Sequence, residues 1–119
     1  GALASIQGGS AAQIGHAVAM ALKNLLGLVC DPVAGLVEVP CVKRNVVGAV
    51  NAVSCADMAM AGIQSRIPPD EVIDAMQEVG CKMDSAFRET ALGGLAATKT
   101  GQEIMHKLME TEEDGTITT

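Results

Sequence analysis

The run VKRNVVGAVNAVSCADMAMA, residues 42–61, decides the fold. Only three of its twenty side chains are charged: Lys43, Arg44 and Asp57. A helix that is apolar nearly all round is buried on most sides, so this run predicts a central helix that ends at Gly62 as a C-cap. Three small residues recur along one side of it: Gly48, Ala52 and Ala56. Such a stripe predicts close packing against a neighbouring backbone.

A first helix is expected immediately after Ser10. Ser10 and Gln13 have the spacing of a capping box, in which each side chain bonds to the backbone N–H of the other residue. Apolar residues then recur at helical spacing over residues 11–26: Ile14, Val18, Leu22, Leu25 and Leu26. A second stripe of small residues on this helix also predicts tight packing: Ala11, Gly15 and Ala19.

Further helices are expected in the C-terminal half of the chain. Prolines followed by acidic residues at 67–71 are typical of a helix start, and an amphipathic helix should continue to residue 83. Its inward side should carry five apolar residues: Val72, Ile73, Met76, Val79 and Met83. Three elements follow: a short helix or turn at 85–91, a loop at 93–100 and a last helix at 102–110. The pair Gly93 and Gly94 permits unusual dihedrals in that loop.

These patterns predict an all-α fold, a compact helical domain of about four to five helices with a buried Cys-containing loop between the first two. We assign this domain to residues 1–110 and a flexible acidic tail to residues 111–119. Helical periodicity fails between Leu26 and Pro40, where glycines and prolines interrupt the chain. That segment is too apolar for a surface loop, so we expect it to be buried, with its backbone groups bonded locally or to a bound group.

The composition limits the core. The chain has 119 residues and is 49% hydrophobic, but Phe87 is its only aromatic residue. A core of Ala, Val, Leu, Ile and Met is thin, and it buries well only where helices approach closely or where more polypeptide covers it. Because the chain also begins with Gly1 rather than methionine, we expect a piece of a longer protein.

Charge and hydropathy exclude several functional classes. The formal net charge is -6, whereas phosphate binding needs clustered lysine and arginine, so nucleic acid is not an expected partner. No basic residue precedes the first apolar stretch and a Gly-Gly-Ser sequence interrupts it, so no secretory signal is predicted. Polar residues also interrupt the uncharged residues 1–22, so no membrane span is predicted.

The four cysteines do not have the spacing of a zinc ribbon or redox motif. They are separated by 11, 14 and 26 residues: Cys30, Cys41, Cys55 and Cys81. Without an export signal, we interpret them as thiols or metal ligands in a reducing compartment. Cys30 and Cys41 flank the apolar loop, and thiolates suit soft metals and iron–sulfur clusters. Spacing alone leaves ligation open, beside the alternative that these thiols are merely buried.

The stretch GLVCDPVAGLVEVPCVKRN, residues 27–45, resembles the signature of the alpha chain of bacterial iron–sulfur L-serine dehydratase. Weaker similarity continues in five stretches: residues 48–49, 54–62, 70–76, 88–90 and 93–96. The resemblance covers about residues 10 to 101, and it implies the C-terminal part of such an alpha chain. It also implies a cytoplasmic, oxygen-sensitive lyase of amino-acid degradation and gluconeogenesis.

The resemblance implies a 4Fe-4S cluster held by three cysteines, with the fourth iron open to substrate. Cys30 and Cys41 match two of these ligands. In the family, the third lies in a Gly-Cys-Gln-Gly-Glu type motif, before the segment that begins at Gly1. Cys55 lies about 21 Å beyond Cys41 along a helix that rises about 1.5 Å per residue, so it is expected to be a core residue. Cys81, about 12 Å out of register with Cys41, is also expected to be structural.

The resemblance also implies a reaction. In the family, L-serine becomes pyruvate and ammonia through an aminoacrylate, without pyridoxal phosphate. The open iron polarises the serine hydroxyl as a Lewis acid, while a base removes the α proton. The sequence does not identify this base: His16 and His106 are expected to be solvated or core residues, and the catalytic residue is expected on polypeptide outside this chain.

Arg44 and Asn45 match the Arg-Asn pair of the family, just beyond the second ligand. We expect Arg44 to bind the serine carboxylate or to neutralise the cluster, and Asn45 to hydrogen-bond the substrate. The alternative is that Arg44 simply pairs with an acid such as Asp31. Asp31 is expected to accept N–H groups of its own loop as an Asx-turn rather than to take part in catalysis.

The implied partners are L-serine, the remainder of the alpha chain, and a beta subunit or regulatory domain, in an oligomer. No nucleic-acid or membrane partner is expected. Two alternatives stay open: a related iron–sulfur lyase such as a cysteine desulfidase, and a non-catalytic helical interaction module. For this chain alone, two thiolates predict no stable cluster and no turnover.

Overall fold

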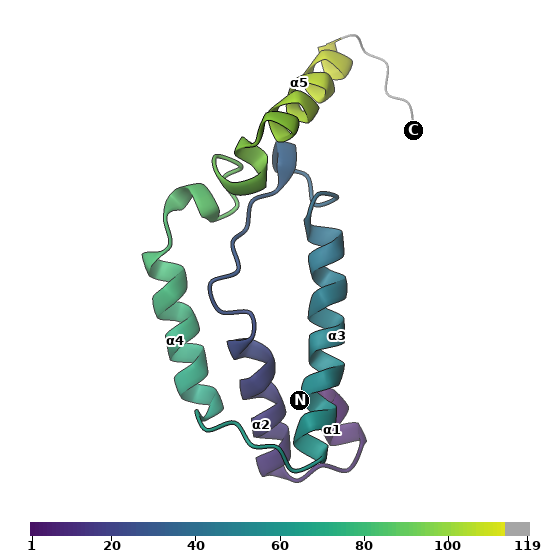
Figure 1. The fold of residues 1–119 in the computed structure, drawn as a ribbon, viewed down its shortest axis with the longest axis vertical. Helices are drawn as coiled ribbons and strands as arrows, with labels where there is room; N and C mark the ends of the chain where they lie inside the picture. The colour runs from purple at the N-terminus through teal and green to yellow at the C-terminus, as the bar shows by residue number, and fades with distance from the viewer. Residues whose placement is uncertain (114–119) are drawn as a thin grey trace. The chain divides into compact units, whose positions relative to one another are not determined.

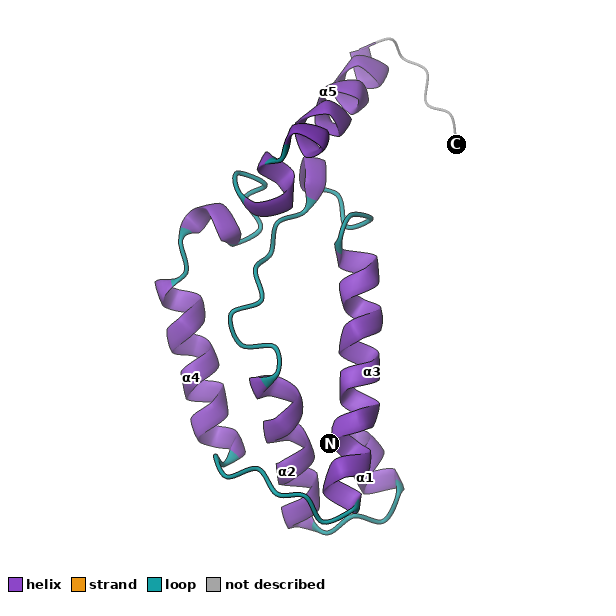
Figure 2. Cartoon of the chain, in the orientation of Figure 1, coloured by secondary structure: helices purple, strands orange, loops and turns teal. Residues whose placement is uncertain are grey.

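The computed structural model describes residues 1–113. Figure 1 shows the course of the chain, and Figure 2 shows that the regular elements of the described part are helical. Five α-helices follow one another: α1 Ala2–Ile6, α2 Ala11–Lys23, α3 Cys41–Met60, α4 Pro69–Lys82 and α5 Lys99–Glu113. Three 3₁₀ turns lie between them: η1 Val33–Gly35, η2 Ser85–Phe87 and η3 Gly94–Ala97. The predicted all-α fold is confirmed.

The described residues form two compact units. The first comprises Gly1–Leu28 and Asn45–Lys82, and the second comprises Val29–Arg44 and the described residues from Met83 onwards. Within the first unit, α2 lies between α3 and α4 (Figure 1).

α2 begins as predicted. Ser10 Oγ accepts a hydrogen bond from the N–H of Gln13 at 3.3 Å, and Gln13 Oε1 accepts one from the N–H of Ser10 at 2.9 Å. The helix ends at Lys23 rather than at residue 26, because the N–H groups of Leu25 and Leu26 bond to carbonyls three residues back. Such bonds tighten the backbone into a turn, which Gly27 continues at φ +75°.

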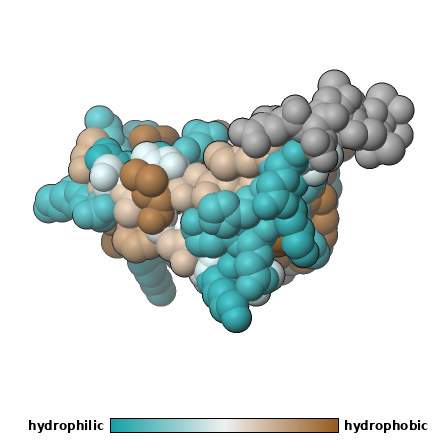
Figure 3. Space-filling model, turned by 90° about the horizontal axis from the view of Figure 1, so that it is seen from above, coloured by the Kyte–Doolittle hydropathy of each residue, from teal (hydrophilic) through white to brown (hydrophobic). Residues whose placement is uncertain are grey.

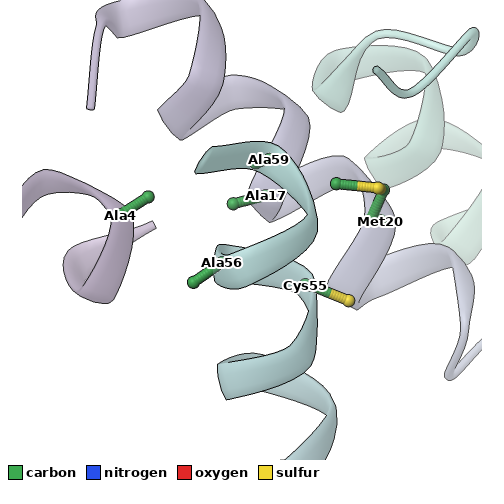
Figure 4. Close-up of a cluster of buried hydrophobic side chains, with 6 residues drawn as sticks. All are labelled: Ala4, Ala17, Met20, Cys55, Ala56 and Ala59. Carbon is green, nitrogen blue, oxygen red and sulfur yellow. The ribbon is translucent and has the colours of Figure 1, made fainter. Parts of the chain in front are cut away.

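The core of the first unit is built from small side chains (Figure 4). Six residues from α1, α2 and α3, each at most 4% exposed, pack together: Ala4, Ala17, Met20, Cys55, Ala56 and Ala59. The close packing predicted from the small-residue stripes is confirmed at Ala19 and Ala56, which are buried, but a Cβ on Gly48 would meet nothing within 4 Å. The sequence did not predict α1, because its five residues are too few to show a helical period.

α3 closely follows the predicted range and ends as expected. The N–H of Ile63 bonds to the Met58 carbonyl at 2.9 Å and that of Gly62 bonds to the Ala59 carbonyl at 3.0 Å. With Gly62 at φ +88°, this pattern is a Schellman motif, so the predicted C-cap is confirmed.

The predicted burial of α3 on most sides is wrong for the part of the chain that the structure describes. Its valines are 49–62% exposed: Val42, Val46, Val47, Val50 and Val53. Only the side that carries Cys55, Ala56 and Ala59 meets neighbouring helices, so an apolar circumference does not by itself produce a central helix. Figure 3 likewise shows apolar residues, in brown, at the surface of one face of the molecule.

α4 begins with the predicted prolines and acids and packs against α2. A Cβ on Gly15 would lie 3.9 Å from the Pro69 side chain, which shows how closely the two helices approach. Val72 is buried, but Ile73 is 48% exposed, so its predicted inward orientation is wrong, whereas Val79 is 39% exposed and a Cβ on Gly27 would lie 3.9 Å from its side chain. Since α2 is the main neighbour of α4, only a narrow line of its side chains is covered.

The second unit contains the cysteine loop, the three 3₁₀ turns and α5, which packs against η1 and η3. α5 starts earlier than predicted, because Thr98 Oγ1 accepts a hydrogen bond from the N–H of Gly101 at 3.1 Å and caps the helix at Lys99. It also continues past residue 110, so residues 111–113 of the expected tail are helical. The remainder of that prediction, residues 114–119, lies outside the described residues.

Burial of the cysteine loop is confirmed only at its beginning. Residues 31–33 are buried, whereas Leu36, Val37 and Val39 are 41–61% exposed. The loop bonds internally instead, with the N–H of Val33 donating to the Val39 carbonyl at 2.9 Å. It joins α2 to α3, so it follows the second helix rather than the first. No helix among residues 1–113 is both long enough and apolar enough to span a membrane.

Candidate functional site

The main chain of Cys30 is held by a short segment after η2. Its N–H donates to the Phe87 carbonyl at 2.9 Å, and its carbonyl accepts from the N–H of Glu89 at 2.8 Å. These two bonds form an isolated parallel bridge with Arg88. Glu89 has φ +64°, a left-handed conformation that is uncommon for a residue other than glycine. The bridge fixes the backbone from which the Cys30 thiol projects.

Asp31 is 2% exposed, and both oxygens of its carboxylate are engaged. Oδ1 accepts from Arg44 Nη1, and Oδ2 accepts from the N–H of Leu95 at 2.7 Å. The expected Asx-turn is wrong, because the N–H of Val33, which such a turn would use, donates to the Val39 carbonyl. Asp31 therefore joins the cysteine loop to Arg44 and to η3.

These contacts determine the ionisation of Asp31. Burial, the largest single effect, raises the pKa of the carboxyl group. The hydrogen bond from Leu95, together with the hydrogen bond and charge of Arg44, outweighs burial and lowers the pKa below its ordinary value. Asp31 is therefore ionised at neutral pH, and its contact with Arg44 is a buried ion pair.

Gly94 permits the close approach of η3 to Asp31. It has φ +60°, and a Cβ on it would lie 2.8 Å from both Cβ and Cγ of Asp31. The neighbouring Gly93 is also confined, since a Cβ there would lie 2.9 Å from the Ala86 carbonyl oxygen. The glycine pair that predicted unusual dihedrals thus supplies one positive φ and two positions without room for a side chain.

Arg44 donates through Nη1 alone, to Asp31 and to the Val29 carbonyl at 3.0 Å. Arg44 does pair with Asp31, and this pairing uses one of its three nitrogens. A guanidinium has five N–H donors, and those on Nη2 and Nε have no hydrogen-bond partner among the described residues. Because the side chain is 27% exposed, these donors remain accessible to a ligand.

Cys30 and Cys41 are free thiols, each partly buried. Burial, the largest effect, raises the pKa of the Cys30 thiol. Glu89 and Asp31 raise it further through their negative charges, while Arg44 opposes them. The two thiols lie on segments that the Asp31–Arg44 ion pair joins, since Asp31 follows Cys30 and Arg44 lies in the helical turn that begins at Cys41.

Two free thiols on segments joined by an ion pair fit part of an iron–sulfur site, because thiolates are the usual ligands of such clusters. Within residues 1–113, however, no group of three or more His, Cys, Asp or Glu side chains could hold a metal ion. The described residues therefore supply two thiol ligands rather than a complete site.

The other candidate residues lie elsewhere in the chain. Cys55 is 1% exposed in the core of the first unit, where its thiol contacts Asn51 Oδ1 at 3.5 Å, so its core role is confirmed. Cys81 is exposed on α4, so a packing role for it is wrong, because α4 is covered along one side only. Three further candidates are partly or fully exposed: His16, His106 and Asn45.

Comparison with known proteins supplies the family. Residues 1–96 match the family described as serine dehydratase alpha chain. The chain belongs to this family. The probable L-serine dehydratase alpha chain of Bacillus subtilis (strain 168) is 63% identical over 107 residues, and that of Latilactobacillus sakei is 64% identical over 103 residues. The L-serine dehydratase alpha chain of Peptoniphilus asaccharolyticus is 51% identical over 109 residues.

These relatives are longer than the serine dehydratase segment described here. The three matches include 85–92% of this chain but only 36–49% of the relatives. The chain thus spans about a third to a half of the curated relatives it matches. The resemblance drawn from residues 27–45 is confirmed by this membership.

In this serine dehydratase segment, the groups that hold the cysteine loop were not predictable from the sequence. They are main-chain groups, the carbonyl of Phe87 and the N–H groups of Glu89 and Leu95. Main-chain donors have no residue signature, so only the glycine pair before Leu95 could have indicated a close approach.

Proposed function

We propose that this serine dehydratase alpha-chain segment carries two cluster ligands of an enzyme that converts L-serine to pyruvate and ammonia. The observation that carries the proposal is the pair of thiols: Cys30 and Cys41 are free, and the Asp31–Arg44 ion pair ties the residue after Cys30 to the helical turn that begins with Cys41. Both are only partly buried, which favours ligation over the alternative of merely buried thiols. Relatives named L-serine dehydratase support the reaction.

Cys30 and Cys41 would hold two irons of a 4Fe-4S cluster, and a third thiolate would come from polypeptide outside the described residues. When bound, the cluster supplies a Lewis acid to the serine hydroxyl. Asp31 is not a further ligand, since both of its oxygens already have partners. The bridge to residues 87–89 would hold the Cys30 backbone in place before the metal arrives.

Arg44 and Asn45 would bind the substrate. Asp31 and Val29 engage only Nη1 of Arg44, which leaves Nη2 and Nε free to donate two parallel hydrogen bonds to the serine carboxylate. Asn45 is exposed and lies four residues after Cys41 in α3, one helical turn along the same side. Its amide can therefore reach a ligand bound beside the Cys41 thiol.

The rest of the active site and the partners would lie outside this chain. We assign the base that removes the α proton to the remainder of the alpha chain. The words "alpha chain" in the names of relatives support a beta subunit or regulatory domain as a partner in an oligomer. The net charge of -6 argues against nucleic acid as a partner, and we place the enzyme in the cytoplasm.

The test uses the full-length protein after anaerobic reconstitution with iron and sulfide. We expect a brown protein with broad visible absorption that forms pyruvate from L-serine. Cys30→Ser and Cys41→Ser should each lose bound iron and turnover. Cys81→Ser is the matched control, because this cysteine is exposed on α4, and it should retain both.

Two results would contradict the proposal. One is a full-length protein that stays colourless after reconstitution. The other is retention of iron in both Cys30→Ser and Cys41→Ser, which would show that these cysteines are not ligands. Sulfide release from L-cysteine, without pyruvate formation from L-serine, would favour a desulfidase instead.

A further inference from the structure

Asp31 is a buried ionisable group to which the proposed reaction assigns no chemical step. Its carboxylate is 2% exposed and is held by Arg44, 13 residues later, and by Leu95, 64 residues later. Burying a carboxylate costs free energy unless its charge is paired and its oxygens are hydrogen-bonded. Each oxygen has a partner here, so the carboxylate joins three separate segments at a single point.

Asp31 and Arg44 each lie close in the sequence to one of the two cysteines. Asp31 directly follows Cys30, and Arg44 lies three residues after Cys41 in the first turn of α3. Their ion pair therefore ties the backbone next to one thiol to the helical turn that begins with the other. The intervening loop is exposed over residues 35–39 and is crossed by a main-chain hydrogen bond from the N–H of Val33 to the Val39 carbonyl, to which the ion pair adds a side-chain contact between the segments of the two thiols.

The hydrogen bond from the N–H of Leu95 is the second contact that holds the Asp31 carboxylate. The N–H of Leu95 reaches Asp31 only because Gly94 has no side chain, since a Cβ there would lie 2.8 Å from Cβ and Cγ of Asp31. Gly35 offers a comparison within the cysteine loop. It also has a positive φ, +73° against +60° for Gly94, but a Cβ on it would meet nothing within 4 Å.

We infer that Asp31 is a positioning residue: through Arg44 and Leu95 it sets the spacing of the Cys30 and Cys41 thiols and orients the free nitrogens of Arg44. The inference rests on the proposed function for the role of these thiols as ligands. Asp31 does not act on substrate itself, because both of its oxygens are engaged and it is almost inaccessible. Its effect is exerted through the groups that it holds.

The spacing of the thiols can be measured without iron. Phenylarsine oxide condenses with two neighbouring thiols and releases one water, so its affinity reports how close they lie. In metal-free full-length protein, Asp31→Asn should weaken its binding by about tenfold or more, since displacements of about 1 Å have effects of this size or larger. Cys30→Ser and Cys41→Ser should each weaken this binding and, combined in one variant, abolish it, since the proposed third thiol alone cannot form the dithiol adduct.

A second pair of variants displaces Asp31 without altering it. Gly94→Ala and Gly35→Ala impose a similar left-handed strain on the backbone, but only Gly94→Ala presses on Asp31. Gly94→Ala should weaken arsenical binding as Asp31→Asn does, whereas Gly35→Ala should stay close to wild type. This pair decides the matter even where Asp31→Asn does not fold.

The outcomes separate the inference from the function on which it rests. Equal arsenical affinity in wild type, Asp31→Asn and Gly94→Ala would overturn the inference, whatever the iron content. Weakened binding in both variants, in a protein that takes up no cluster, would support positioning by Asp31 and refute the proposed cofactor. In the reconstituted protein, both variants should also lose iron to a chelator faster than wild type. An unchanged KM for L-serine in Arg44→Lys would refute only the substrate role of Arg44.

Discussion

Replacing Arg44 by methionine should leave a buried carboxylate without its counter-ion. Arg44 Nη1 bonds to the Asp31 carboxylate and to the Val29 carbonyl, and methionine preserves much of the side-chain length without the charge. In Arg44→Met, the N–H of Leu95 is then the remaining partner of Asp31 among the described residues. The variant tests how strongly the ion pair holds the second unit together.

The size of the effect follows from burial. Breaking a buried pair by removing one partner costs about 3–5 kcal/mol. Asp31 is 2% exposed but Arg44 is 27% exposed, so water screens part of the interaction and the lower end of that range applies. At 1.36 kcal/mol per tenfold change, a loss of about 3 kcal/mol makes local opening of η3 about a hundredfold more frequent.

The effect should depend on pH with a definite sign. The folded-state pKa of Asp31 is lowered, so its stabilising contribution is present above the ordinary carboxyl pKa and is lost as pH falls through the folded value. Arg44→Met removes two of the influences that lower this pKa, whereas burial continues to raise it. A protonated Asp31 no longer needs a counter-ion, so the difference between wild type and Arg44→Met should shrink toward acid.

Amide hydrogen exchange across residues 93–98 of the full-length protein measures this opening directly, after correction for the intrinsic exchange rate at each pH. Lys43→Met is the matched control, because Lys43 carries the same charge at the neighbouring position and forms no ion pair among the described residues. Equal protection in Arg44→Met and Lys43→Met, or a difference that widens toward acid, would refute the reasoning.

Three further predictions concern the first unit of the 119-residue chain. Ser10→Ala removes the capping hydroxyl of α2 and should lower stability by about 1 kcal/mol in thermal unfolding. Ala56→Leu overfills the core and should cost about 1–3 kcal/mol, whereas Ala49→Leu on the exposed side of the same helix should be nearly neutral, and equal losses would contradict the described core. In the native protein, Cys81 should react rapidly with a thiol reagent and Cys55 only on unfolding, which mass spectrometry of the labelled peptides would show.

The helices were predictable where local chemistry decides them. The Ser10 and Gln13 side chains fix the start of α2, and Gly62 fixes the end of α3, because each depends on residues within one turn. Burial was less predictable. The valines of α3 have the same hydrophobicity whether or not a neighbour covers them, so the sequence predicted a central helix and the structure exposes these residues by 49–62%.

In the candidate site, too, some features were predictable from the sequence and others were not. Its cysteines, Arg44 and Asn45 could be identified by resemblance, since their side chains and spacing are visible in the sequence. The sequence could not show which partner Asp31 has, because an Asx-turn within the loop and an ion pair with Arg44 would both supply hydrogen bonds to its carboxylate. The structure decides for the ion pair, and it adds an N–H donor 64 residues away that no local pattern indicates.

Three of the stretches that resemble the family, distant in the sequence, contact one another in the second unit. Residues 27–45 carry its strongest part, and residues 88–90 and 93–96 carry two weaker parts. In the structure these stretches meet: Cys30 bridges to Arg88, and Asp31 accepts from Leu95 beside Gly94. Residues 27–45, 88–90 and 93–96 are the matched stretches that hold the two thiols in place, whereas residues 48–49, 54–62 and 70–76 lie in the first unit, so the resemblance covers the helical core as well as the site.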